Sequence, residues 1–419
     1  MKLLKVQLDS EARSSMINKF SLVAAVLFAG VSGYAYFAFF PLYLSSIGFS
    51  VGTITFIMIW MGVGMAIFSW IFGRISDRTG RRKLFFISAL ILQVIIFLLI
   101  PVSNNFFYLS ILTFFRGFIL GMRMPVANAL FADIVEKSNK KKEIDKTMGA
   151  PEVTGSQLSI LSATKSTGWA VGVLISSFVI ATFGVSAIVI FLISSTGIAL
   201  IFALPVKDVK DKELELLEDN ADSLEIPAEK IKSPKQGGKV KIILFVTVFF
   251  RQFGLIPFLQ IISILLTDAG ISEGMAGVII ALNPILQIIA MIINGRLIDN
   301  PKISERLMLA VGFILSALTL LSYFVGSTTG NIAFFILGQI CVGFGWGFIY
   351  TGAVKYIVNR APLDRAFYMG IWITDLQIAK IVSYITFAFL WEIVELSPTF
   401  VLPFAVIGPL IGFVLVFWL

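Results

Sequence analysis

Residues 73–83 read GRISDRTGRRK, and a long apolar run stands on each side of them. The run before is IWMGVGMAIFSWIF, and the run after is LFFISALILQVIIFLLI. The eleven residues include five cations and one carboxylate. A soluble core would not hold them, because charged side chains are rarely buried without partners. Gly73 and Gly80 indicate a close helix approach and a tight turn rather than a flexible linker. The stretch therefore predicts a short polar loop between two membrane-spanning helices.

The composition indicates a membrane protein. Hydrophobic residues make up 58% of the 419 residues, charged residues make up 14%, and the mean hydropathy is +0.93. Soluble domains contain about 45–50% apolar and about 25% charged residues. A spanning helix needs about 20 apolar residues. Runs of this kind are found at 20–44, 51–72, 84–102, 107–133, 157–182, 185–205, 240–266, 275–297, 306–325, 331–358, 366–391 and 395–419. We therefore expect an all-α integral membrane protein with twelve transmembrane helices.

The basic residues mark one side of the membrane. Of the 33 Lys and Arg residues, 28 fall in the amino-terminal segment or in every second gap between spans, and five lie within spans. The alternate gaps contain none. Because loops rich in Lys and Arg stay in the cytoplasm, we expect a multi-pass protein of the cell membrane with both termini cytoplasmic. The net charge of +8 then reflects topology, with membrane lipids as partners and no nucleic acid.

A polar stretch divides the chain into two similar halves. Residues 206–239 are rich in charge, contain two prolines and a Gly-Gly, and indicate a cytoplasmic linker. The predicted domains are the cytoplasmic segment 1–19, a six-helix bundle at 20–205, this linker at 206–239 and a second six-helix bundle at 240–419. GRISD at 73–77 recurs as GRLID at 295–299. Transporters are often built from such repeated halves, with the substrate site between them near the membrane midplane.

The stretch GRISDRTGRRK resembles motif A of the major facilitator superfamily, G-x-x-x-D-R-x-G-R-R/K. It lies between the second and third spans, as in that family. With twelve spans and a degenerate copy of the motif in the second half, the resemblance covers the whole chain. It implies two pseudo-symmetric six-helix bundles that rock about a central site and give alternating access.

The resemblance also implies a conformational latch, in which the motif holds the two bundles together at their cytoplasmic ends in the outward-open state. Asp77 would meet the beginning of the span at 366–391, where an aspartate is favourable because the N-terminus of a helix is positive. Arg81 would reach an acid at the inner end of the 107–133 span, most simply Asp133. The predicted latch residues are Gly73, Asp77, Arg78, Gly80, Arg81, Arg82 and Asp133.

Five cations lie near the middle of the spans. They are Arg116, Arg123, Lys165, Arg251 and Lys380. Each charge at the centre of a bilayer costs about 2.5–3.5 kcal/mol on insertion scales, so these side chains should face a water-filled cavity or one another. Arg116 and Arg123 are two helical turns apart and therefore share one face of their helix. The resemblance places the spans at 107–133 and 240–266 on the central cavity.

One acid, Asp375, lies clearly within the spans. It can neutralise one of the cations, which leaves the others without an acidic partner there. Asp375 and Lys380 lie about 140° apart around their helix, so they should not pair with each other. Trp346 and Tyr350, with Tyr34 and Tyr36, can also line the pocket. The predicted substrate-binding residues are Arg116, Arg123, Arg251, Lys165, Lys380, Asp375, Tyr350 and Trp346.

Positive charges around a cavity favour an anionic substrate, because arginine forms paired hydrogen bonds with carboxylate and phosphate. The sequence therefore predicts a secondary active transporter for a small organic or inorganic anion. An enzyme is not expected, because the chain has no histidine, no metal-ligand cluster and one cysteine, Cys341, within an apolar run. No cofactor and no metal are expected, and we expect a monomer.

Two alternatives stay open. A multidrug or amphipathic-compound exporter is favoured by the form of motif A and by STGWAVG at 166–172, which resembles the antiporter motif G-x-x-x-G-P. Val173 stands where that motif has proline, which weakens this reading. The remoter alternative is a non-transporting membrane receptor, which would not need repeated halves. A proton as the coupling ion is compatible with the sequence, but no feature indicates it.

Overall fold

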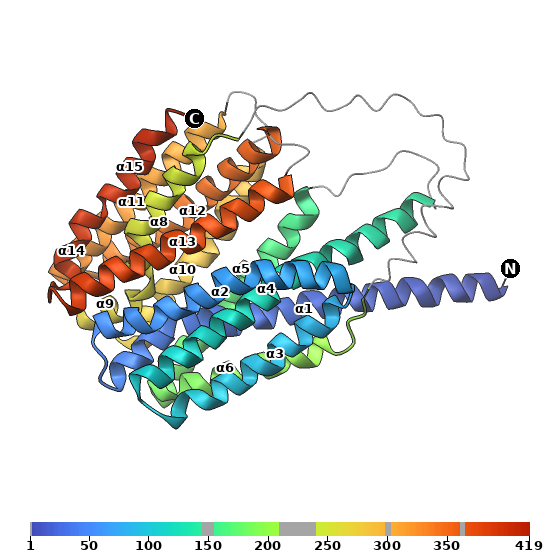
Figure 1. The fold of residues 1–419 in the computed structure, drawn as a ribbon, viewed down its shortest axis with the longest axis horizontal. Helices are drawn as coiled ribbons and strands as arrows, with labels where there is room; N and C mark the ends of the chain where they lie inside the picture. The colour runs from blue at the N-terminus through green and yellow to red at the C-terminus, as the bar shows by residue number, and fades with distance from the viewer. Residues whose placement is uncertain (1, 145–154, 209–239, 298–302, 361–364) are drawn as a thin grey trace.

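The computed structural model describes residues 2–144, 155–208, 240–297, 303–360 and 365–419 (Figure 1). These residues form helices joined by short connections, and none of them forms a β-strand. The helices of the first half are α1 (Lys2–Ser46), α2 (Val51–Thr79), α3 (Arg82–Leu99), α4 (Phe106–Ile144), α5 (Gly155–Phe183) and α6 (Ile188–Ala203). Those of the second half are α8 (Ile243–Gln260), α9 (Ile262–Asp268), α10 (Glu273–Leu297), α11 (Glu305–Thr329), α12 (Ile332–Arg360), α13 (Arg365–Glu392), α14 (Pro398–Ala405) and α15 (Ile407–Val416). The short 3₁₀ turns η1 (Ile100–Val102) and η2 (Val185–Ala187) lie in the first half.

Within the described residues, 12 helical segments are long and apolar enough to cross a membrane. Each overlaps one of the runs predicted from the sequence, so the prediction of a twelve-helix, all-α membrane protein is confirmed. Two helices are longer than expected. α1 begins already at Lys2, and α4 continues to Ile144. Figure 1 shows the first part of α1 extending beyond the other helices.

The helices form two bundles, α1–α6 and α8–α15 (Figure 1). The bundles diverge towards the ends of the helices where the chain begins and finishes, and we call this side of the molecule the terminal end. They meet at the opposite end, near Ser50 and Glu392, which we call the far end. The predicted domain boundaries stay predictions, and the predicted linker lies outside the described residues except for 206–208.

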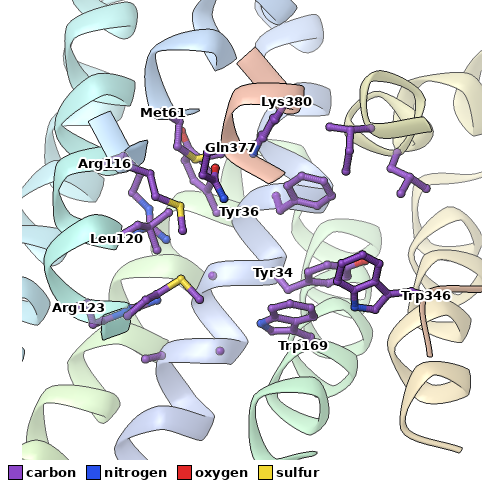
Figure 2. Close-up of a pocket in the computed structure, with 18 of the residues that line it drawn as sticks. Tyr34, Tyr36, Met61, Arg116, Leu120, Arg123, Trp169, Trp346, Gln377 and Lys380 are labelled. Atoms are coloured by element: carbon purple, nitrogen blue, oxygen red, sulfur yellow. The ribbon is translucent and has the colours of Figure 1, made fainter. Parts of the chain in front are cut away.

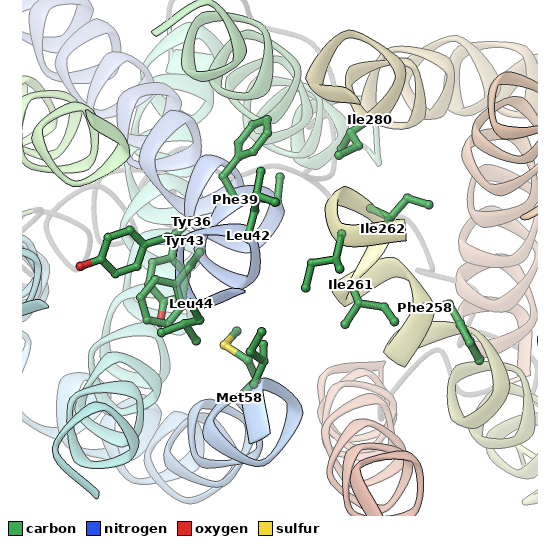
Figure 3. Close-up of a cluster of buried hydrophobic side chains, with 14 of the residues drawn as sticks. Tyr36, Phe39, Leu42, Tyr43, Leu44, Met58, Phe258, Ile261, Ile262 and Ile280 are labelled. Carbon is green, nitrogen blue, oxygen red and sulfur yellow. The ribbon is translucent and has the colours of Figure 1, made fainter. Parts of the chain in front are cut away.

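Buried hydrophobic side chains show that the far end is closed. The largest cluster joins both bundles: Figure 3 shows Phe39 and Leu42 of the first bundle opposite Ile261 and Ile262 of the second. Two smaller clusters lie at the terminal end, and each is confined to one bundle. One continuous apolar core therefore seals the far end, whereas the bundles are packed separately at the terminal end. The structure is a conformer that opens towards the terminal end.

Prolines loosen the helices at defined points. The predicted span at 240–266 is divided at Ile261 into α8 and α9. Pro257 lies one turn before this break and has no N–H for the carbonyl of Phe253. The hydroxyl of Ser383 in α13 donates to this carbonyl at 2.5 Å, so a backbone group that lipid could not satisfy gains a partner.

A second proline leaves a helix carbonyl free, and a side chain of the opposite bundle bonds it. Pro41 in α1 leaves the carbonyl of Phe37 without a helical N–H. Nε2 of Gln260 in α8 donates to this carbonyl across the interface at 3.3 Å. The hydroxyl of Tyr384 in turn donates to Oε1 of Gln260 at 2.7 Å. A gap in one helix is therefore filled by a side chain of the opposite bundle.

The last predicted span, 395–419, is divided at Val406 into α14 and α15. Pro409 explains this break, because it cannot donate to the carbonyl of Ala405. Gly254 of α8 packs against that carbonyl, and a Cβ at Gly254 would lie too close to it. The break therefore lies at a close contact between α8 and the last span.

Glycines bring α2 and α4 into backbone contact. A Cβ at Gly117 would overlap the carbonyl oxygen of Met61, and a Cβ at Gly64 would overlap the carbonyl oxygen of Phe114. In contrast, a Cβ at Gly197 in the middle of α6 would meet nothing within 4 Å. The two kinds of helical glycine should respond to alanine in opposite directions.

We expect Gly117→Ala to lower the free energy of unfolding by about 1–3 kcal/mol, because α2 and α4 must move apart. Gly197→Ala should raise it by up to about 1 kcal/mol, because alanine favours helix and no neighbour obstructs it. Thermal unfolding of the two purified variants in the same detergent measures the difference. Equal midpoints for both variants would contradict the backbone contact between α2 and α4.

Candidate functional site: a cationic cavity between the bundles

A cavity of about 350 Å³ lies between the two bundles. Its wall is formed by α1 to α5 from the first bundle and by α8, α10, α12 and α13 from the second. Cavities that bind small molecules usually measure about 300–1,000 Å³, so the size suits a small solute. Figure 2 shows the side chains that point into this space.

Four cations line the described part of the cavity. They are Arg116, Arg123, Arg251 and Lys380. The first two project from one face of α4, as their spacing predicted, and Figure 2 shows them on the same side of the cavity. No Asp or Glu is among the lining residues that the structure describes. The described wall is therefore positively charged.

Three residues predicted to bind substrate do not contribute to this wall as described. Contrary to the prediction, Asp375 does not line the cavity, because it lies about 140° around α13 from Lys380. Its Oδ2 is buried without a hydrogen-bond partner among the described residues. Tyr350 does not line the cavity either, although its ring lies 6.1 Å from that of Trp346, which does. The side chain of Lys165 lies outside the described residues.

Gln93 of α3 joins the two arginines of the first bundle. Nη1 of Arg123 donates to Oε1 of Gln93 at 2.7 Å, and Nη1 of Arg116 donates to the same oxygen at 3.3 Å. The guanidinium carbon of Arg116 also lies 5.3 Å from the ring centroids of Tyr36 and Phe97. An amide and aromatic faces therefore hold these buried cations.

Arg251 provides the cation of the second bundle, and its side chain is only 2% exposed. Its Nε donates to Oγ of Ser316 at 2.8 Å, and its Nη1 donates to Oε1 of Gln252 at 3.1 Å. The guanidinium carbon lies 5.2 Å from the ring centroid of Trp346. These contacts fix the side chain, and neither hydrogen bond uses the Nη2 group.

Aromatic rings form a further part of the wall. Tyr34 and Trp169 stack with centroids 5.1 Å apart and an angle of 10° between the ring planes. Nδ2 of Asn283 donates to the hydroxyl of Tyr34 at 3.3 Å across the two bundles. Nζ of Lys380 lies 5.7 Å from the ring of Phe37. Such faces suit a planar apolar group that also carries a charge.

Sequence reasoning missed Gln93, Trp169 and Ser316 as site residues. Gln93 did leave a signal, because it is the one amide in the apolar run at 84–100, and polar residues inside a span rarely lack a role. Trp169 and Ser316 left none, since aromatic and small residues are common throughout this chain.

The loop at residues 73–83, which carries motif A, is largely exposed at the terminal end. Gly80 ends α2 with a φ of 62°, and its N–H donates to the carbonyl of Ser76 at 3.0 Å, which confirms the predicted tight turn. Arg78 and Arg81 are exposed. The close approach expected at Gly73 is absent here, because a Cβ there would meet nothing within 4 Å. The loop is therefore not packed against the second bundle at these described residues.

The latch itself stays a prediction. The side chains of Asp77 and Asp133 lie outside the described residues, as do residues 361–364 at its expected docking point. Arg82 is half-buried in the same loop. Because the terminal end is open, the present conformer is the one in which such a latch would be released.

A polar contact joins the bundles at the far end. The carboxylate of Glu392, at the end of α13, accepts from the backbone N–H and the hydroxyl of Thr53, both at 3.0 Å. It also accepts from the hydroxyl of Ser50, the residue that caps the N-terminus of α2. Gly52 lies directly against Glu392, with no space for a Cβ. An anion at the positive end of a helix therefore bridges the two bundles.

The family comparison agrees with this architecture. The family profile described as Major Facilitator Superfamily matches residues 22–261 and 242–419. The chain belongs to the Major Facilitator Superfamily. It is therefore a multi-pass membrane transporter and not an enzyme, as the sequence predicted.

One relative of similar sequence is NiaP of Bacillus subtilis (strain 168), named as a candidate niacin/nicotinamide transporter. The two sequences are 33% identical over 131 residues. The match covers 30% of this chain and 29% of NiaP, so it spans less than a third of the curated relative.

Solved transporter structures share the fold of this chain. The nucleoside transporter NupG has a TM-score of 0.71 at 11% identity, with 96% of this chain and 97% of NupG covered. A bacterial homologue of the human drug peptide transporters PepT1 and PepT2 has a TM-score of 0.65 at 13% identity, with 96% of this chain and 97% of that chain covered. At these identities the likeness concerns the fold alone.

Proposed function

We propose that this transporter binds a small organic or inorganic anion between the arginines of α4 and Arg251 of α8. The charge of the cavity supports the proposal: Arg116, Arg123, Arg251 and Lys380 line it, and no described lining residue is acidic. Guanidinium groups bind carboxylate or phosphate through paired, charge-assisted hydrogen bonds. A bound anion would also supply the compensating charge that these buried cations lack.

The proposal places the protein in the cell membrane with the terminal end in the cytoplasm. Its support is the excess of Lys and Arg at that end, where 28 of the 33 such residues are expected. In this orientation the open terminal end admits solute from the cytoplasm. A monomer stays a prediction from the sequence, and a proton as the coupling ion stays compatible with the sequence without a feature that indicates it.

Alternating access by rocking of the two bundles is part of the same proposal. Two contacts between the bundles stabilise the present conformer. Glu392 bonds the N-terminus of α2 at the far end. Gly277 of α10 packs so closely against Ser177 of α5 that a Cβ at Gly277 would overlap the serine side chain. In the opposite conformer, the latch formed by Asp77, Arg81 and Asp133 would close the terminal end. Each set of contacts stabilises one conformer, so transport would alternate between them.

An aromatic carboxylate is the form of anion that we favour. The stacked rings of Tyr34 and Trp169 line the same cavity as the arginines. The name of the relative NiaP mentions niacin and nicotinamide. Niacin is a pyridine carboxylate that is ionised at neutral pH, whereas nicotinamide is its uncharged amide. Comparing the binding of niacin with that of nicotinamide therefore separates the contribution of the negative charge from the contribution of the ring.

A thermal-unfolding screen of the purified protein tests the proposal. The panel consists of nicotinate and other small carboxylates, inorganic phosphate, the matched uncharged amides and cationic dyes. We expect at least one anion to raise the unfolding midpoint and its amide to leave it unchanged, because a ligand at 100 times its Kd adds about 2.7 kcal/mol to the free energy of unfolding. A panel in which no anion stabilises the protein would contradict the proposal.

An exporter of amphipathic compounds is the second candidate function. Met61, Met65 and Met124 line the cavity, and methionine side chains adapt to ligands of varied shape. The same panel distinguishes the two candidates. Stabilisation by cationic dyes, with none by anions, would favour the exporter.

A further inference from the structure

Gln93 lies at the centre of a buried hydrogen-bond network, and its side chain is 0% exposed. Its Oε1 accepts from Nη1 of Arg123 at 2.7 Å and from Nη1 of Arg116 at 3.3 Å. Its Nε2 donates to the hydroxyl oxygens of Ser32 at 3.0 Å and Thr196 at 3.1 Å. The network therefore joins α1, α3, α4 and α6 of the first bundle.

The partners determine which way the amide points. Arginine only donates, so the amide oxygen must face the two guanidinium groups. The hydroxyls of Ser32 and Thr196 donate to the carbonyls of Ala29 at 3.2 Å and Leu192 at 2.7 Å, so their lone pairs are left to accept from the amide nitrogen. Gln93 therefore uses both its donors and its acceptor oxygen in one arrangement.

The network brings two like charges together without cancelling them. Arg116 and Arg123 are both buried, and like charges at short range repel. Nε of Arg116 has no hydrogen-bond partner among the described residues, and both side chains line the cavity. Because the carbonyl of Gln93 is neutral, the full charge of the pair stays available to a ligand.

We infer that Gln93 is a specificity-determining positioning residue of the anion site, an inference that rests on the proposed function. It places the two guanidinium groups side by side at the cavity wall and leaves their charge intact. A glutamate of the same shape would hold the arginines at least as firmly but would cancel one charge. The neutral amide therefore determines whether the first bundle attracts an anion.

A charge-selective thiol probe tests this without knowledge of the substrate. Cys341 is buried and is the only cysteine of the sequence, so it is replaced by alanine. Leu120→Cys then provides a thiol in the cavity wall between the two arginines (Figure 2). Two methanethiosulfonate reagents are compared: the sulfonatoethyl reagent is an anion, and the trimethylammonioethyl reagent is a cation. The reaction rate of each reagent with the cavity thiol is divided by its rate with a free thiol in solution. We define the anion preference as the relative rate of the anionic reagent divided by that of the cationic reagent, so the reactivity of the cavity thiol itself cancels.

We expect the parent chain to prefer the anionic reagent by about tenfold or more, the scale at which a charged cleft concentrates ions. Gln93→Glu should lower this preference about tenfold in a protein that still folds, because the hydroxyls of Ser32 and Thr196 can rotate to donate to the second carboxylate oxygen. Gln93→Met keeps the charge of the two arginines but removes the oxygen that both of them bond. The unfolding midpoint should therefore fall, and the anion preference should fall by a smaller factor than in Gln93→Glu.

A folded Gln93→Glu variant with an unchanged preference would overturn the inference. If that variant does not fold, Gln93→Met decides, because a preference equal to that of the parent chain would show that the amide does not position the arginines. A parent chain without any anion preference would instead contradict the proposed function, so the two failures are distinguishable.

Discussion

Arg251→Gln should abolish saturable uptake, in proteoliposomes, of the anion that stabilises the purified protein most. Arg251 is buried and fixed by Ser316, Gln252 and Trp346, so no other side chain of α8 can replace its charge. Removing one partner of a buried, hydrogen-bonded charge pair costs about 2–5 kcal/mol of binding. We therefore expect the affinity to fall by at least about 30-fold.

The same substitution should not destabilise the fold. Arg251 has no carboxylate partner among the described residues, so its charge is uncompensated in the empty protein, and a neutral amide of similar length removes a burial penalty. Lys241→Gln is the matched control, because Lys241 carries the same charge outside the cavity and donates to the carbonyl of Trp418. Uptake by Arg251→Gln equal to that of the control would contradict a role in binding.

Glu392→Gln should move the protein away from the conformer described here. The carboxylate accepts three hydrogen bonds from the N-terminus of α2, across the two bundles. Losing a cap and its charge at a helix N-terminus costs about 1–2 kcal/mol. The population open at the far end should therefore rise about tenfold. Spin labels at Phe183 and Phe400, both exposed and near the far end of opposite bundles, measure the change as longer label separations.

Glu395→Gln is the control for charge alone. Glu395 lies three residues after Glu392 and is exposed. Its substitution by glutamine removes the same negative charge from the far end as Glu392→Gln does. We expect its distribution of label separations to match that of the parent chain. If Glu392→Gln also leaves the distribution unchanged, the contact with α2 does not stabilise the closed far end.

The periodicity of the sequence predicted those features that depend on local structure. Arg116 and Arg123 share a face of α4 because helical geometry fixes side chains seven residues apart, and Asp375 points away from Lys380 for the same reason. The glycine turn at Gly80 likewise followed from the residue type. Two residues assigned to the site from the sequence, Asp375 and Tyr350, do not line the described cavity.

Features that depend on contacts between distant residues could not be predicted. Gln93 is 23 and 30 residues from its two arginine partners, and only the packing of α3 against α4 brings them together. The contact between Glu392 and Thr53 joins residues 339 apart. Which end of the molecule is closed depends on such contacts, so the sequence alone did not indicate the conformer.

Charge selectivity of the cavity tests the central claim most directly, because it requires no knowledge of the substrate. In the Cys341→Ala, Leu120→Cys chain, the account predicts that the anionic methanethiosulfonate is preferred by about tenfold or more relative to its rate in solution. Adding Arg116→Gln and Arg123→Gln, which remove the two cations on either side of Leu120, should lower this preference towards one. A thiol that reacts equally with both reagents, or that favours the cationic one, would contradict a cavity built to hold an anion.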